Sequence, residues 1–337
     1  LKHSRTYTYP TPYASMYNFS QWDGHMQVMT YTHTRLALGS NLTLTFATDK
    51  GDSFASTLFE KLWLMIYRFE QRFSRFLPKS ELSKLNARAG EEVAISREFH
   101  RLLAASREMS NLTENLYNPF VLPLLQKAGY VGSFVDGYDP GETDNYAHRH
   151  VVEPTELMLG ATHAHIPENT ALDMGGIGKG YLADALCTSR LVRELQGFWC
   201  SVGGDTAGFG TAAGGAWKLG IQNAHDHEHI LATFDAPEGE FHVATSGTIV
   251  RRGKDNSWHH IIDPRSGKSS ESDVLLATLA CGSTTKADVL ASCAVILGSK
   301  NALPWLKKKG VDSALLQLAS GDICGYGYLY EKAGGSQ

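Results

Sequence analysis

The residues best suited to chemistry begin with a glycine-rich segment, ALDMGGIGKGYLAD, at residues 171–184, whose glycines are Gly175, Gly176, Gly178 and Gly180. Glycines carry no side chain, so backbone N–H groups can approach an anion, and the start of a following helix adds the positive end of its dipole. The pattern therefore favours a phosphate group. A tight strand-to-helix turn, in which glycine supplies positive φ, is the alternative.

Two better-known glycine loops do not fit this segment. A Walker loop needs Lys followed by Ser or Thr, whereas Lys179 is followed by Gly180. The dinucleotide fingerprint needs Gly-x-Gly-x-x-Gly, whereas the glycines at 176, 178 and 180 are evenly spaced. The sequence thus predicts an anion-binding loop of another kind.

A candidate metal site lies in the later segment TTKADVLAS, where Asp288 and Ser292 are four residues apart and would share one face of a helix. Mg²⁺ takes about six oxygen ligands, commonly one carboxylate with hydroxyls, carbonyls, waters and substrate phosphates. Both side chains are therefore candidate ligands. The alternative is an aspartate that complements the helix dipole and a serine bonded to the preceding turn.

A histidine pair precedes a turn signal in HHIIDPRSG, residues 259–267. Pro264 suits the second position of a turn and Gly267 a position of positive φ, so the segment predicts a strand running into a tight hairpin. Neighbouring strand residues point to opposite faces, so only one of His259 and His260 can face a site. A histidine there can act as general base, and an exposed strand histidine is the alternative.

Other polar patterns are open to two interpretations. The tract HDHEH, residues 225–229, contains the residue types of a metal site, but alternating histidines on a charged loop more often form a solvated bend. Asp173 and Lys179 bracket the glycine loop. The aspartate could simply form an Asx-turn, and the lysine could contact a phosphate or lie in solvent.

Composition limits the classes of protein. The 337 residues are 42% hydrophobic, enough for a substantial core in one or two domains. The net charge of −4, with both signs interspersed, gives no basic face for nucleic acid, and charges interrupt the longest apolar stretch, residues 58–69, so no membrane span is expected. Five cysteines without a C-x-x-C pair favour buried reduced thiols and a reducing compartment.

The elements expected to position these residues are both helices and strands. Alternation over residues 42–46 predicts a half-buried strand, and apolar spacing predicts helices over 58–73, 99–109 (capped by Ser96), 182–195, 287–297 and 303–309. Strands are expected at 198–202, 217–222, 229–234, 241–245, 259–263 and 274–280, with two more after the last helix. The lack of strict βαβ alternation favours the α+β class. We expect an extended arm at 1–34, one domain at 35–330 with a surface insertion at about 131–150, and a tail at 331–337.

Eight motifs occur in the order typical of the ApbE-type FAD:protein FMN transferase family, and the chain resembles that family over roughly residues 35 to 320. They are LGSNLTLTF (38–46), FSRFLPKSELSKLN (73–86), LYNPF (116–120), the loop at 173–184, SVGGD (201–205), TSG (245–247), HHIIDPRSG (259–267) and ADVLAS (287–292).

The resemblance implies an α+β core similar to the T-fold, with FAD in a cleft between a helical N-terminal part and a strand-rich C-terminal part. The implied reaction moves FMN from FAD to a Ser or Thr hydroxyl of an acceptor protein, with Mg²⁺ and release of AMP. His260 would be the general base, and the backbone carbonyl of Gly176 would join Asp288 and Ser292 as metal ligands. The positions matching FAD contacts are Leu38, Phe76, Asn86, Leu116, Tyr117, Asn118, Asp173, Lys179, Thr245, Ser246 and Ile262.

Some positions depart from the family. Tyr117-Asn118 stands where Phe-Asp is usual, Phe76 replaces a commoner Tyr, and Ser292 replaces a commoner Thr but keeps the hydroxyl. Two other functions stay open: Mg²⁺-dependent hydrolysis of FAD to FMN and AMP, a balance that the segment ending in Asn86 helps to set, and FAD storage without chemistry. The family usually resides in the cell envelope, whereas the unpaired cysteines and the lack of a visible signal peptide favour the cytoplasm.

Overall fold

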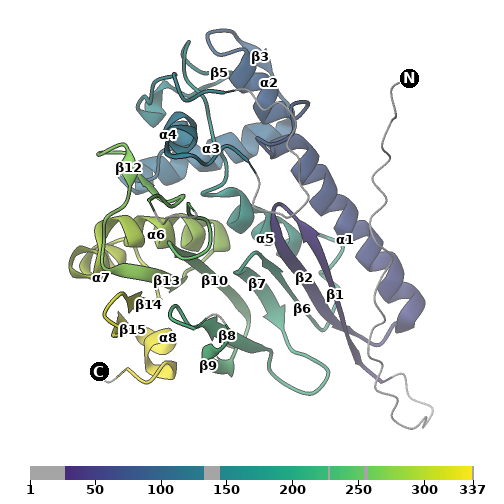
Figure 1. The fold of residues 1–337 in the computed structure, drawn as a ribbon. Helices are drawn as coiled ribbons and strands as arrows, with labels where there is room; N and C mark the ends of the chain where they lie inside the picture. Colours follow the sequence, from purple (N-terminus) through teal and green to yellow (C-terminus); the bar gives the residue numbers. More distant parts are fainter. Residues whose placement is uncertain (1–26, 133–144, 227, 254–256, 336–337) are drawn as a thin grey trace, which may run out of the picture.

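The computed structural model describes residues 27–132, 145–226, 228–253 and 257–335. Helices and strands follow one another irregularly, which confirms the α+β class (Figure 1). The strands are β1 (Met29–Ala37), β2 (Ser40–Thr48), β3 (Val93–Ala94), β4 (Met158–Leu159), β5 (His163–His165), β6 (Gly197–Val202), β7 (Asp205–Gly210), β8 (Lys218–Gln222), β9 (Ile230–Asp235), β10 (Glu240–Gly247), β11 (Ile262–Asp263), β12 (Lys268–Ser269), β13 (Val274–Ala280), β14 (Ser313–Leu318) and β15 (Ile323–Tyr326). The α-helices are α1 (Gly51–Phe73), α2 (Glu81–Ala87), α3 (Arg97–Leu112), α4 (Leu122–Ala128), α5 (Gly178–Cys187), α6 (Thr284–Leu297), α7 (Ser299–Lys308) and α8 (Gly327–Lys332).

An antiparallel sheet of eight strands, in the order β1-β2-β6-β7-β10-β13-β14-β15, forms the framework. Helices α1, α5 and α6 pack on one face, where Leu44 of β2 meets Leu62 of α1 in one cluster and Ala244 of β10 belongs to the cluster around α6. The preceding residue of β10, Val243, packs on the other side with Leu329 of α8. This alternation follows from the two-residue period of a strand.

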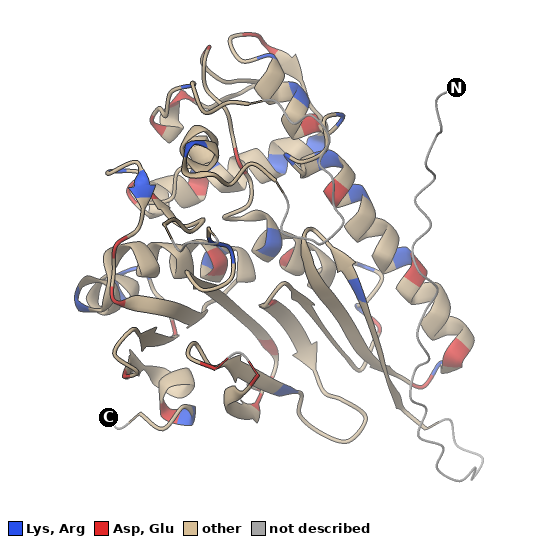
Figure 2. Ribbon diagram, in the orientation of Figure 1, with Lys and Arg blue, Asp and Glu red and all other residues tan. Residues whose placement is uncertain are grey.

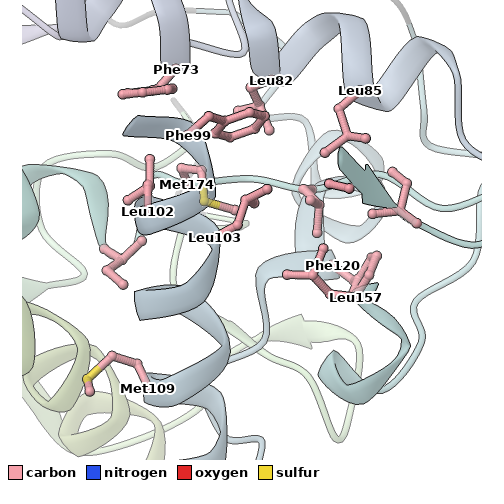
Figure 3. Close-up of a cluster of buried hydrophobic side chains, with 14 of the residues drawn as sticks. Phe73, Leu82, Leu85, Phe99, Leu102, Leu103, Met109, Phe120, Leu157 and Met174 are labelled. Carbon is pink, nitrogen blue, oxygen red and sulfur yellow. The ribbon is translucent and has the colours of Figure 1, made fainter. Parts of the chain in front are cut away.

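A second layer of helices holds the glycine loop. Its core is a cluster from α1, α2, α3 and the neighbouring loops (Figure 3). Ser96 caps α3 as predicted, accepting a hydrogen bond from the Phe99 N–H at 3.1 Å. Met174 and Ile177 of the loop are buried in the same cluster. Apolar packing therefore fixes the loop before α5 begins.

Several predicted boundaries were wrong. Residues 29–34, expected in an arm, belong to β1, whereas the rest of that arm up to residue 26 lies outside the described residues. The helix expected over 182–195 ends at Cys187, because the chain turns there and buries Val192 and Leu195 in later turns. The strand expected at 259–263 contains only Ile262 and Asp263.

The C-terminal end also differs from the prediction. The two closing strands β14 and β15 are followed by α8, which includes two residues assigned to a tail, and Leu329 of α8 is fully buried. The insertion expected at about 131–150 falls largely outside the described residues, and residues 145–150 form no helix or strand.

The global properties agree with the composition. Acidic and basic residues are interspersed along the elements in the ribbon view of Figure 2. Within the described ranges, no helix is long and apolar enough to cross a membrane. All five cysteines are unpaired, and four of them are buried, as expected. Burial raises the pKa of Cys187 and Cys281 to about 12, so these thiols stay protonated near neutral pH.

Candidate functional site

The glycine loop connects the helical layer to α5, and main-chain hydrogen bonds fix its conformation. The Asp173 N–H donates to the Pro119 carbonyl at 2.8 Å, and the Gly178 N–H donates to the Met174 carbonyl at 2.7 Å. None of the four loop glycines, all within the described residues, has positive φ. The alternative of a turn that needs glycine for its backbone angles is therefore wrong, and at Gly180 the missing side chain instead permits a close approach.

Gly180 allows the start of α5 to pack closely against α6. Its N–H donates to Asp288 Oδ2 at 3.0 Å, which joins α5 to α6. A Cβ atom at this position would lie 2.5 Å from the Thr284 carbonyl oxygen and 2.8 Å from Asp288 Cβ. A second tie lies one turn further along α5, where the Asp184 carboxylate accepts hydrogen bonds from the N–H groups of Thr284 and Thr285 at 2.9 and 2.8 Å. These contacts set the position of Asp288.

Substitution of Gly180 tests this packing. We expect Gly180→Ala to lower the melting temperature by several degrees and to weaken metal binding, because the added methyl group forces α5 away from α6 and lengthens the hydrogen bond to Asp288. Calorimetry and a Mn²⁺ titration measure the two effects. Gly214→Ala, where nothing lies within 4 Å of the added atom, is the control. A Gly180→Ala protein indistinguishable from the wild type in both measurements would contradict this account.

Three charged side chains meet beside this contact. Lys179 Nζ pairs with Asp205 Oδ2 and lies 3.8 Å from Asp288 Oδ1. Their side chains are 15%, 0% and 2% exposed, respectively. Burial opposes the charge on Lys179, but the two carboxylates outweigh it and raise the pKa of the lysine. Burial and the nearby Asp288 charge raise the pKa of Asp205. Lys179 is thus a buried ion-pair partner, and the interpretation as a solvated lysine is wrong.

Hydroxyl groups from the sheet complete this side of the site. Ser246 Oγ on β10 lies 2.9 Å from Ser292 Oγ on α6, and the Thr245 N–H donates to Asp205 Oδ1 at 3.3 Å. Three residues predicted from distant parts of the sequence, Ser246, Asp288 and Ser292, therefore belong to one region around α6. The serine in α6 bonds across to β10, unlike the local alternative in which it bonds to its own preceding turn.

These groups suit a hard cation. Carboxylate, hydroxyl and backbone carbonyl oxygens are the ligands that Mg²⁺ prefers, and the ammonium of Lys179 already lies beside the Asp288 carboxylate. Across the part of the chain that the structure describes, no group of three or more His, Cys, Asp or Glu side chains could hold a metal ion. The expected set of Asp288, Ser292 and the Gly176 carbonyl has only one carboxylate, so it is not a cluster of that kind.

The histidine tract at 225–229 has ordinary hydrogen-bond partners. His225 Nε2 lies 2.8 Å from the Leu318 carbonyl oxygen, and His229 Nδ1 lies 2.7 Å from Asp226 Oδ2. Residue 227 lies outside the described residues. The contacts agree with the solvated bend that the sequence favoured.

His260 lies in a loop that pairs with residues 251–253 rather than in a strand. Its N–H donates to the Arg251 carbonyl at 3.0 Å, and its Nδ1 lies 3.3 Å from the same oxygen. A carbonyl can only accept, so Nδ1 carries the proton and Nε2 of the neutral ring is free to act as a base. Burial, together with the charges of Arg251 and Lys179, lowers the pKa of His260 to about 3.

His259 differs from His260, but not through strand alternation. Its Nε2 lies 3.0 Å from the Ser270 carbonyl oxygen, and its N–H donates to Ser269 Oγ at 3.0 Å. These contacts tie the histidine loop to the segment around β12. His259 is therefore a structural residue.

An aromatic and cationic group lies next to His260. The ring of Tyr130 packs edge-on against His260 at a centroid distance of 6.4 Å. The Arg75 guanidinium lies over both Phe76 and Tyr130, at 4.2 and 4.6 Å from their ring centroids. Arg75 Nε also pairs with Asp173 Oδ2 at 2.7 Å. The predicted residues Phe76 and Asp173 are thus joined by a residue that the prediction omitted.

Asp173 forms the Asx-turn given as an alternative and also makes an ion pair that was not predicted. Its Oδ1 accepts the Gly175 N–H at 2.6 Å, which is the Asx-turn alternative, and its Oδ2 pairs with Arg75. Asn86 likewise supports the loop, since its side chain accepts the Leu172 N–H at 2.8 Å and donates to the Leu172 carbonyl at 2.9 Å. Both side chains are held in place by the protein.

Other predicted ligand contacts also have structural partners. Asn118 Oδ1 accepts the Phe120 N–H at 2.8 Å and its Nδ2 donates to the Val152 carbonyl at 2.9 Å, while the Tyr117 hydroxyl lies 3.1 Å from Ser106 Oγ. Leu38 has a φ of 52° in the turn between β1 and β2, and its N–H donates to Glu70 Oε1 at 2.9 Å. Leu116 and Ile262 are buried.

Sequence reasoning missed three charged residues at the site. They are Arg75, Asp205 and Arg251, whose guanidinium donates to Ser40 Oγ at 3.0 Å. Asp205 ends the quoted motif SVGGD, which was a usable signal. Arg251 had no such signal, because it belongs to no quoted motif and reaches the site through its main-chain pairing with His260 and through its charge.

The fold and the site define an α+β protein in which a glycine loop, a cationic lysine and the oxygen atoms of carboxylate and hydroxyl side chains gather at the contact of two helices with a sheet. The chain belongs to the ApbE family, whose model matches residues 38–316. An FAD:protein FMN transferase of Klebsiella pneumoniae (strain 342) is 24% identical to it over 301 residues, or 87% of this chain and 90% of that protein. One from Treponema pallidum (strain Nichols) is 24% identical over 312 residues, or 87% of this chain and 86% of that protein.

Solved structures agree on the fold. The ApbE protein of Thermotoga maritima superposes with a TM-score of 0.78 at 22% identity, covering 90% of this chain and 99% of that one. The apo form of the flavinyl transferase ApbE of Pseudomonas stutzeri gives a TM-score of 0.76 at 20% identity, covering 92% and 99%. These likenesses confirm the expected ApbE-like core.

Proposed function

We propose that this chain transfers FMN from FAD to a Ser or Thr hydroxyl of an acceptor protein, with Mg²⁺ and with release of AMP. The observation that carries the proposal is the contact between the glycine loop and α6, in which the Gly180 N–H and Lys179 both approach the carboxylate of Asp288. Membership of the ApbE family and the transferase names of its relatives support the same reaction.

The proposed binding roles follow from charge. Lys179 and Arg251 supply positive charge for the diphosphate of FAD. Asp288, Ser292 and the Gly176 carbonyl would hold Mg²⁺, which supplies electrostatic stabilisation of the charge that develops on the phosphate oxygens. Phe76, whose ring lies under the Arg75 guanidinium and next to Tyr130, is the proposed flavin contact on the side of His260.

His260 is proposed as the general base. In the step, the acceptor hydroxyl oxygen bonds to the phosphorus of the FMN half of FAD, and the bond from that phosphorus to the bridging oxygen breaks. AMP leaves with that oxygen and its electron pair. The hydroxyl proton passes to Nε2 of His260, which its Nδ1 contact with the Arg251 carbonyl keeps available.

The deciding experiment follows both products. The protein is incubated with FAD, Mg²⁺ and an extract of its own source cells as the supply of acceptors. Gel fluorescence and mass spectrometry detect covalent FMN, and chromatography measures AMP. We expect one AMP for each FMN attached. AMP that forms without an adduct would indicate FAD hydrolysis, bound FAD without AMP would indicate storage, and either outcome would refute the transferase.

A further inference from the structure

Lys179 lies between the carboxylates of Asp205 and Asp288, and this position affects how strongly Asp288 can bind a metal ion. Asp205 and Asp288 are almost completely buried, and one ammonium lies within ion-pair distance of both. When both carboxylates are ionised, the cluster formed by Lys179, Asp205 and Asp288 carries a net charge of −1. A buried site of this kind attracts a cation, yet the nearest oxygen of Asp288 already faces Lys179.

We propose that Lys179 is the resident counter-ion of Asp288 and competes with the metal ion for it, and that the diphosphate of FAD relieves the competition by drawing the ammonium away. The inference rests on the proposed function for the identity of the diphosphate. It makes metal binding weak until FAD is bound, so that metal and FAD strengthen each other's affinity.

The surroundings of Lys179 allow only a limited choice of partners. Its Cδ lies 3.4 Å from where a Cβ of Gly203 would be, so the stem runs beneath the turn between β6 and β7. Asp205 is fixed by the Thr245 N–H at 3.3 Å. The ammonium is therefore anchored by Asp205 on one side and shared with Asp288 on the other. Removal of either neighbour changes the strength with which Lys179 occupies Asp288.

The competition predicts shifts of opposite sign in two variants. Lys179→Met removes the competing cation, so Mn²⁺ should bind the FAD-free protein at least about tenfold more tightly than it binds the wild type. Asp205→Asn keeps the hydrogen bond from Thr245 through its amide oxygen but leaves Lys179 to pair with Asp288 alone, so Mn²⁺ should bind several-fold more weakly. A purely structural role for the cluster would weaken Mn²⁺ binding in both variants.

The control removes a lysine from the same helix. Lys286 lies two residues before Asp288 but makes no ion pair with it that the structure records among the described residues. Lys286→Met should change Mn²⁺ affinity by less than about twofold, because only screened long-range charge is lost. Calorimetry and the electron paramagnetic resonance signal of free Mn²⁺ measure affinity without any turnover. Addition of ADP as the diphosphate should bring the wild type close to Lys179→Met.

Each outcome decides the proposal. Equal or weaker Mn²⁺ binding in Lys179→Met overturns it, as does tighter binding in Asp205→Asn or a similar gain in Lys286→Met. If Lys179→Met does not fold, unchanged or tighter binding in Asp205→Asn still refutes the proposal. If the Mn²⁺ affinities change as expected but the protein makes no FMN adduct, the competition between Lys179 and the metal ion stands and only the proposed transferase function is refuted. If the protein transfers FMN but the Mn²⁺ affinities do not change, the competition is refuted and the transferase function stands.

Discussion

His260→Ala should lower the rate of FMN transfer by about 10²-fold or more, the usual scale for loss of a general base. FAD affinity should stay within a few-fold of the wild type, because the charged groups proposed to bind the diphosphate lie on α5 and in the loop at Arg251. Single-turnover transfer and an FAD titration separate the two effects. His163→Ala, an exposed position on β5, is the matched control. A His260→Ala protein with normal turnover would move the general base to another residue, with Asp173 next to be tested.

The surroundings of His260 determine the pH dependence expected of it. With its pKa lowered to about 3 by burial, Arg251 and Lys179, the ring stays neutral between pH 5 and 8 in the FAD-free protein. An ascending limb of kcat/KM near the ordinary histidine value is therefore not expected from this residue. In the complex with FAD, the negative charge of the diphosphate would offset the charges of Arg251 and Lys179 and raise the pKa of His260. An ascending limb would then be expected in the pH profile of kcat.

Nitrogen chemical shifts of the imidazole test this directly. The signals that disappear in His260→Gln should not titrate between pH 5 and 8 without FAD. Because the folded pKa lies below the unfolded value, the wild type loses stability as the pH falls below about 6.5, and His260→Gln should lose less. A His260 signal that titrates near 6.5 would contradict the proposed environment.

Asp288→Asn should abolish most activity by removing the only charged ligand of the expected metal set. The amide oxygen can still accept the Gly180 N–H, so α5 and α6 should stay together and the protein should fold. We expect Mn²⁺ affinity to fall by about 10²-fold, with activity only partly restored by excess metal. The measurement is a Mn²⁺ titration of the folded variant.

The control for Asp288→Asn is a carboxylate of the same type outside the site. Asp312 is exposed and immediately precedes β14, so Asp312→Asn should titrate as the wild type does. If the Asp288→Asn titration overlays that of the wild type, the metal ligands must be sought among other oxygens.

Local patterns in the sequence determined much of the framework. The helix over 58–73 and the cap at Ser96 were predicted, because helical period and capping depend only on residues a few positions apart. The turn at Gly267, which has a φ of 72°, was predicted for the same reason. Local spacing also indicated Asp288, the family motifs added Ser246, and the structure brings both to α6 and its neighbouring strand.

The errors share a physical cause. The periodicity of residues 182–195 continued past the end of α5, because Val192 and Leu195 are buried in turns that no local signal distinguishes from a helix. His260 was placed on a strand whose extent depends on pairing, and its main-chain partner is Arg251, which no local pattern marked as a partner.

By itself, the sequence determined the α+β class, the family and the residue types that can bind a phosphate and a hard cation. Only the tertiary structure decided the state in which those residues are held. Lys179 is a shared counter-ion because Asp205 and Asp288 come from different elements and are both buried. His260 has a lowered pKa because Arg251 and Lys179 surround it. Charge interactions and burial depend on distances in space, and residues far apart in the sequence set those distances.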